Sequence, residues 1–108
     1  MPYHILVKFT VPQENRHSFI LAAQTDARDS LNNEPGTLQF EIIQDEADRS
    51  VIYFHEVYRS QSDFEQHCQG QAFTIFFDTI SEYCPPPEFL CKGEQIKWIK
   101  PYFEGMTK

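Results

Sequence analysis

The first apolar segment of the chain alternates between hydrophobic and other residues. Its odd-numbered positions carry the large apolar side chains, Tyr3, Ile5, Val7, Phe9 and Val11. A period of two is typical of an extended strand whose side chains point alternately to its two faces. The pattern therefore predicts a β-strand over residues 3–11. Pro12 then favours the start of a helix, because the missing N–H of a proline has no partner in a first turn anyway.

A helical period follows over residues 13–31. The apolar positions recur three or four residues apart, at Phe19, Ala22, Ala23, Ala27 and Leu31. The segment 32–36, Asn-Asn-Glu-Pro-Gly, ends this helix and turns the chain. Residues 37–44 and 51–59 are rich in aromatic and β-branched side chains and flank the polar segment 45–50, so we expect them to pair as strands.

The second half of the chain repeats the sequence of a helix and a strand. Residues 60–62 can cap a helix that begins near Asp63, and Gly70 interrupts it. A second helical piece carries an apolar stripe at Phe73, Phe76, Phe77 and Ile80. Three consecutive prolines at 85–87 end helix formation. The last strand is predicted within residues 89–102, with Ile96 and Trp98 on one face.

The order of predicted elements is β-α-β-β-α-β, which indicates an α+β fold of the ferredoxin-like type with an antiparallel sheet. Both helices then cover one face of the sheet. The strand over 51–59 is apolar on both faces, since Phe54 and Tyr58 point one way and Tyr53 and Val57 the other. A second layer is needed on the open face, so we expect a homodimer, sheet against sheet. The length of 108 residues fits a single domain over 1–108.

Composition excludes several classes of partner. A net charge of -7 with only nine basic residues argues against binding to nucleic acid or to an anionic membrane surface. No window approaches the roughly 18 apolar residues of a membrane span, and no secretory signal is visible. Cys68, Cys84 and Cys91 form no C-x-x-C pair, which favours reduced thiols and a cytoplasmic protein.

Two titratable residues stand out as candidates for chemistry. Glu56 shares its strand face with aromatic residues, so its pKa should rise or the carboxylate should be paired; a structural hydrogen bond is the alternative. His67 titrates near neutral pH and can act as a general base or bind substrate, unless it forms an ion pair with Asp63 one turn earlier. No H-E-x-x-H motif or phosphate-binding loop occurs, so no metal or cofactor is expected.

The segments 32–38 (NNEPGTL), 56–67 (EVYRSQSDFEQH) and 70–77 together resemble the antibiotic biosynthesis monooxygenase family, over about residues 3–100. The resemblance implies a dimeric α/β barrel with a cavity between the sheet and the helices of each protomer. Some relatives oxidise quinols or anthrones with O2 and no cofactor. The resemblance makes Glu56 and His67 the catalytic candidates, and its candidates for substrate binding are Asn32, Phe54, Tyr58, Phe73, Phe76 and Trp98.

Three hypotheses about function follow. The first is a cofactor-independent monooxygenase for a small aromatic or quinol-like substrate, with His67 as base and Glu56 as polariser or proton relay. The second is an isomerase of a small phosphorylated metabolite, which would need a cationic contact from Lys8, Arg59 or Lys97. The third is a non-catalytic dimeric binding module. A closed aromatic cavity that contains His67 favours the first, a basic mouth the second, and a collapsed cavity the third.

Overall fold

The alternating segment at the start of the chain forms the first strand, β1 (Tyr3–Thr10). In a computed structural model that describes residues 1–99, Ile5, Val7 and Phe9 are buried on one side of this strand. The elements confirm the predicted α+β order. They are β1 (Tyr3–Thr10), the 3-10 turn η1 (Gln13–Asn15), α1 (Arg16–Asn33), β2 (Thr37–Gln44), β3 (Val51–Tyr58), α2 (Gln61–Cys68), α3 (Gln71–Ile80) and β4 (Glu88–Glu94).

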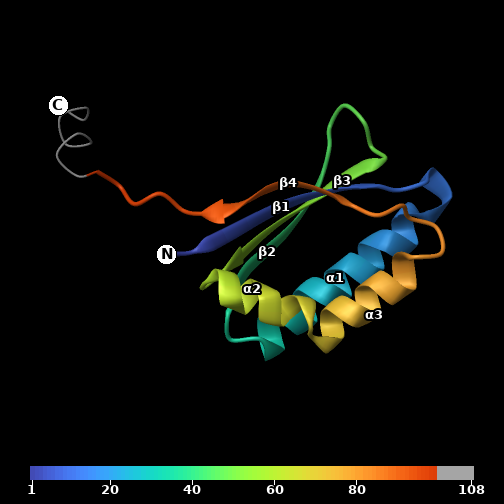
Figure 1. Cartoon of the computed structure of the whole chain (residues 1–108). Coiled ribbons are helices and arrows are strands. Elements are labelled where there is room, and N and C mark those ends of the chain that lie inside the picture. Colours follow the sequence, from blue (N-terminus) through green and yellow to red (C-terminus); the bar gives the residue numbers. More distant parts are fainter. Residues whose placement is uncertain (100–108) are drawn as a thin grey trace.

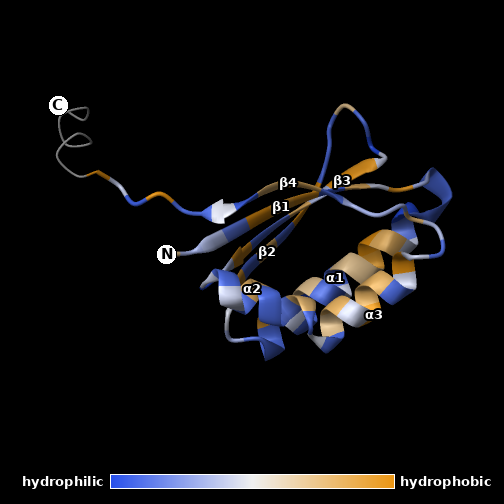
Figure 2. Ribbon diagram, in the orientation of Figure 1, coloured by the Kyte–Doolittle hydropathy of each residue, from blue (hydrophilic) through white to orange (hydrophobic). Residues whose placement is uncertain are grey.

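The sheet has the strand order β2-β3-β1-β4, and every neighbouring pair is antiparallel. All three helices lie on one side of it (Figure 1). The centre of the core is aromatic, with the Phe9 and Phe54 rings 4.6 Å apart and the Phe54 and Phe76 rings 5.4 Å apart. Figure 2 shows hydrophobic residues along β1, β3 and the two long helices. The core therefore lies between the sheet and the helices, and the opposite sheet face carries no layer formed by the described residues 1–99.

Two of the predicted boundaries differ most from the structure. The first α-helix begins at Arg16, because Gln13–Asn15 form a 3-10 turn first. The last strand ends at Glu94, where it pairs with Tyr3 at the start of β1. The backbone N–H of Gln95 still donates a hydrogen bond of 2.8 Å to the carbonyl of Pro2, and residues 96–99 then extend away from the body (Figure 1). The end of the predicted strand, residues 100–102, lies outside the described residues.

The turn before β2 packs tightly against the start of α2. Ser60 caps α2 by accepting a hydrogen bond from the backbone N–H of Asp63, and the Asp63 carboxylate accepts bonds from Ser60 and Arg59. A Cβ placed on Gly36 would lie 2.4 Å from the Asp63 carboxylate and 2.5 Å from its Cβ. Gly36 is therefore needed for close approach rather than for a special backbone conformation.

Gly36→Ala is expected to destabilise the protein by about 1–3 kcal/mol, because the added methyl group displaces Asp63 and with it the N-terminal cap of α2. Urea denaturation measures the difference. Gly93→Ala is the matched control, since nothing lies within 4 Å of a Cβ at that position. Equal stability of the two variants would contradict the role assigned to Gly36.

Candidate active site

His67 lies in the last turn of α2 and is 3% exposed. Its Nδ1 is 2.7 Å from Oε1 of Glu34, and its Nε2 is 3.9 Å from Oε1 of Glu56. The alternative pairing with Asp63 was wrong, because that carboxylate is used by Arg59 and by the helix cap. The histidine ring therefore lies between two carboxylates from two other parts of the chain.

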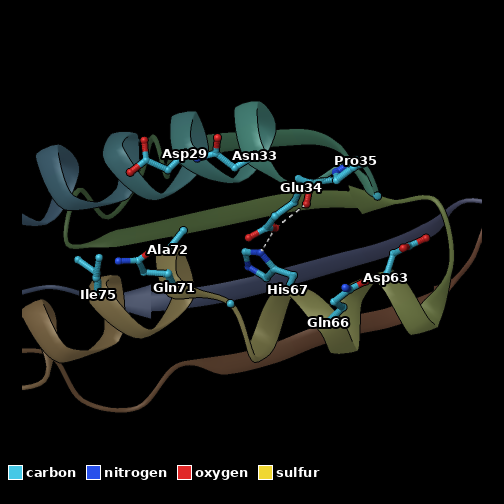
Figure 3. Close-up of a pocket in the computed structure, with 13 residues that line it drawn as sticks. Asp29, Asn33, Glu34, Pro35, Asp63, Gln66, His67, Gln71, Ala72 and Ile75 are labelled. Carbon is cyan, nitrogen blue, oxygen red and sulfur yellow. Dashed lines mark hydrogen bonds and ion pairs between the residues drawn. The ribbon is translucent and has the colours of Figure 1, made fainter.

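Glu34 comes from the loop that follows α1 and was missed in the sequence analysis. Its Oε1 also accepts a hydrogen bond from the Thr37 hydroxyl at 2.8 Å, which fixes the carboxylate. Figure 3 shows Glu34 reaching across to the ring of His67. The Asn-Glu-Pro-Gly segment that contains Glu34 was interpreted only as a turn. No periodicity in the sequence relates a residue of this turn to His67, which lies 33 residues later in the chain.

Glu56 is 6% exposed on β3, on the helix side of the sheet as expected. Its Oε1 accepts a hydrogen bond from the hydroxyl of Tyr58. Burial raises the pKa of Glu56, while the Tyr58 hydrogen bond and the charge of His67 oppose the rise. Burial, followed by the charge of Glu56, also raises the pKa of Tyr58, so its phenol stays neutral and donates.

Asp26 is a second buried acid that the sequence analysis did not single out. It is 4% exposed on α1, and its Oδ1 accepts a hydrogen bond of 3.1 Å from the fully buried Ser30 one turn later. The pKa of Asp26 is raised to about 8, mainly by burial and next by the charge of Glu56. The sequence did contain a signal for this buried acid, because helical spacing places Asp26 and Ser30 on the same helix face as Ala23 and Ala27.

Two hollows meet at His67. The first, here called the outer cleft, has a volume of about 520 Å³ and lies between the end of α1 and helices α2 and α3 (Figure 3). Its polar lining includes Asp29, Asn33, Glu34, Asp63, Gln66 and Gln71. The second, the inner cavity, lies between the sheet and the helices and contains His67, Glu56 and Asp26. Six phenylalanines line it: Phe9, Phe54, Phe64, Phe73, Phe77 and Phe89.

The two hollows differ in what they can hold. The outer cleft falls in the size range of small-molecule sites, about 300–1,000 Å³. The inner cavity has a volume of about 20 Å³, room for about one water-sized molecule. Phenylalanine rings dominate its lining, and an aromatic substrate enters only if some of these rings move. Phe89 is exposed and Phe73 and Phe77 are half-buried, so these three rings form the side of the cavity nearest to solvent.

The other predicted binding residues fall in different places. Phe54 and Phe73 line the inner cavity, and the Tyr58 ring lies 5.2 Å from that of His67. Phe76 lines a groove of about 360 Å³ between α1 and α3. Asn32 is exposed and lines none of these hollows, whereas its neighbour Asn33 lines the outer cleft. Trp98 is 73% exposed beyond the end of β4 and lines none of them either.

Charge and metal chemistry complete the description of the site. No lysine or arginine of residues 1–99 lines the outer cleft, the inner cavity or the α1–α3 groove. Of the three cations considered for a phosphorylated substrate, Lys8 and Lys97 line none of these hollows, and Arg59 is used in an ion pair with Asp63 of the outer cleft. Within the same described stretch, no group of three or more metal-ligating side chains is arranged to hold a metal ion. None of the described helices is long and apolar enough to cross a membrane.

The family model for antibiotic biosynthesis monooxygenase matches residues 2–79. An uncharacterised protein from Synechocystis sp. is 26% identical over 99 residues, which cover 92% of this chain and 63% of that protein. The chain thus spans less than two thirds of the length of this curated relative.

Solved structures share the fold. A candidate antibiotic biosynthesis monooxygenase from Nitrosomonas europaea aligns with a TM-score of 0.80 at 22% identity, over 86% of this chain and 89% of that one. Another, from Caulobacter crescentus, gives a TM-score of 0.83 at 15% identity, over 89% and 91% of the two chains. A conserved protein from Methanosarcina mazei gives 0.81 at 16% identity, over 89% and 94%.

Proposed function

This chain belongs to the antibiotic biosynthesis monooxygenase family, and on that premise we propose that it oxidises a small aromatic or quinol-like substrate with O2 and without a cofactor. One observation carries the proposal: His67 is buried at the boundary of an aromatic cavity, with carboxylates on both of its ring nitrogens. A base held in this way can take a proton from a substrate and keep the resulting positive charge between two negative groups.

His67 is the base in this proposal. With Nδ1 donating to Glu34, the free Nε2 points toward Glu56 across a gap of 3.9 Å. The acidic hydroxyl or C–H group of the substrate binds within hydrogen-bond reach of Nε2 after the rings of Phe73, Phe77 and Phe89 move apart. Glu34 lines the outer cleft, so the proton taken up inside the cavity has a path through the imidazole to water.

The substrate anion then reduces O2 directly. For an activated methylene carbon, one oxygen atom replaces the two hydrogens on carbon to give a ketone, and the other oxygen atom leaves with those two hydrogens as water. The protein supplies deprotonation, orientation and exclusion of water. The phenylalanine lining suits O2 as the cavity stands, and an uncharged aromatic ring once the rings of Phe73, Phe77 and Phe89 have moved. The acidic lining of the outer cleft disfavours a phosphorylated substrate.

Oxygen uptake with a panel of hydroquinones and anthrones under 18O2 tests this proposal. We expect uptake above the spontaneous background and a product that gains one 18O atom, with the second atom found in water. Uptake that yields hydrogen peroxide and an unlabelled product would indicate an oxidase. Uptake no greater than in buffer alone would contradict the proposal for these substrates.

We also propose that the protein is a homodimer through the open face of its sheet. The side chains that alternate away from the helices include Leu6, Ile43 and Tyr53, and Ile43 is exposed. Burial of these side chains against a second copy removes apolar surface from water, which favours association.

Ile43→Glu is expected to convert the dimer to a monomer, since a carboxylate buried without a partner costs several kcal/mol, and each 1.4 kcal/mol weakens association about tenfold. Analytical ultracentrifugation measures the mass. The matched control is Leu31→Glu, an exposed leucine on α1 away from the open face. Identical masses for wild type and both variants would contradict this interface.

A further inference from the structure

Two carboxylic acid side chains line the inner cavity, although one general base, His67, is enough to deprotonate a substrate. Asp26 and Glu56 approach the cavity from α1 and β3, and both line it together with His67. Two carboxylates that share a cavity repel each other, so one of them holds its proton more strongly than the other. The surroundings of the two groups decide which one is ionised.

Glu56 is the better placed of the two to carry the charge. Its Oε1 accepts the hydrogen bond from Tyr58, and the imidazole of His67 lies 3.9 Å away. Asp26 has one hydrogen-bond donor, the hydroxyl of Ser30. The charged groups that act on Asp26 are Glu56 on β3 and Asp29 and Glu34 on or next to α1, and all three oppose its ionisation. Helix α3 presents apolar side chains beside it, Ala72, Ile75 and Phe76.

Asp26 also has a route to solvent that does not pass His67. It lines the α1–α3 groove as well as the inner cavity, so it lies in the wall between them. His67 has the corresponding place between the inner cavity and the outer cleft. The cavity is thus bounded by two proton-carrying groups, each of which faces a different external hollow.

We propose that Asp26 is the proton donor of this site, a neutral carboxylic acid that protonates the peroxide formed when the substrate carbon bonds to O2. This step rests on the proposed oxygenase function. His67 first takes a proton from the activated methylene carbon, and the resulting carbanion adds to O2 to give a peroxide anion. The O–H bond of Asp26 then breaks as a new O–H bond forms at the terminal oxygen of the peroxide, which gives the neutral hydroperoxide.

The same two groups complete the reaction with atoms and electrons in balance. The Asp26 carboxylate takes the remaining C–H proton while the O–O bond breaks, and this forms the ketone and hydroxide. Hydroxide takes the proton held by His67 and leaves as water. Both residues return to their starting states, and one O2 is reduced by four electrons.

Infrared spectroscopy tests the protonation state without any substrate. The wild-type protein is expected to show the carbonyl stretch of a protonated carboxylic acid at neutral pH, and this band should disappear in Asp26→Asn. Asp78→Asn, the same substitution at an exposed aspartate of α3, should leave it unchanged. Ser30→Ala should shift the midpoint of the band to higher pH, because it removes the hydrogen bond that favours the carboxylate. A wild-type band that Asp26→Asn does not alter would overturn the proposal.

Turnover with an active substrate tests the donor role itself. Asp26→Asn is expected to slow formation of the ketone product by about 10²-fold or more and to release hydroperoxide, while deprotonation of the substrate stays close to the wild-type rate. Equal loss at every step would indicate a structural role and overturn the proposal. If wild type consumes no O2, the proposed oxygenase fails by that result, whereas the infrared band still decides whether Asp26 is neutral.

Discussion

His67→Ala is expected to lower the rate of substrate-dependent oxygen uptake by about 10²–10⁴-fold, the range for loss of a general base. The ring lies between Glu34 and Glu56, so its removal also leaves these two carboxylates without the imidazole that separates them. The loss should therefore appear in the chemical step rather than in substrate affinity alone.

The matched control is His17→Ala, which removes an exposed histidine from α1. It is expected to retain wild-type oxygen uptake. Glu34→Gln keeps the shape of the partner of Nδ1 but removes its charge, and we expect a smaller loss than in His67→Ala. Uptake by His67→Ala at the wild-type rate, with the fold intact by circular dichroism, would exclude His67 as the base.

Asp26→Asn is expected to make the protein more stable, by about 2–5 kcal/mol near pH 8. The pKa of Asp26 is raised from 3.8 to about 8 in the folded state, so between these values the folded chain holds a proton that the unfolded chain has lost. The folded state of the wild type is therefore penalised as pH rises from about 4 to about 8. Asparagine carries no such cost and can still accept from Ser30.

Urea denaturation of both proteins at several pH values measures this difference. The two unfolding free energies should be closest below about pH 4 and should diverge steadily up to about pH 8. Asp78→Asn is the control and should differ from wild type by no more than about 0.5 kcal/mol, as for other exposed substitutions. A constant difference between Asp26→Asn and wild type across this range would show that Asp26 is ionised in the folded state.

A gain in stability together with a loss of activity would have a clear meaning. Burying an acid without a cationic partner costs folding free energy, and such costs are typical of functional sites. Asp26 and Ser30 could each be replaced by an apolar residue without loss of the helix, since their neighbours Ala23 and Ala27 already form that face. The polar pair therefore points to chemistry rather than to packing.

The sequence by itself determined the elements and their order. The period of two in residues 3–11 and the helical stripe of Phe73, Phe76 and Ile80 are local patterns, and each reports a face that must be buried. Strand β2 has the predicted bounds, and β3 is only one residue shorter than predicted. Alternation alone predicted that Glu56 shares a strand face with Phe54 and Tyr58, and the structure shows that this face is the one covered by the helices.

Only the tertiary structure decided which polar groups meet. Glu34, His67 and Asp26 come from a turn and two separate helices, and no local period relates their positions. Asp63 was the nearer partner of His67 along the chain, but the cap of α2 and Arg59 already use it. The last strand ends at Glu94, where it pairs with Tyr3 of β1, and no property of residues 95–99 reveals this pairing. Periodicity records burial within one element, whereas ion pairs and strand ends depend on the neighbour that packing supplies.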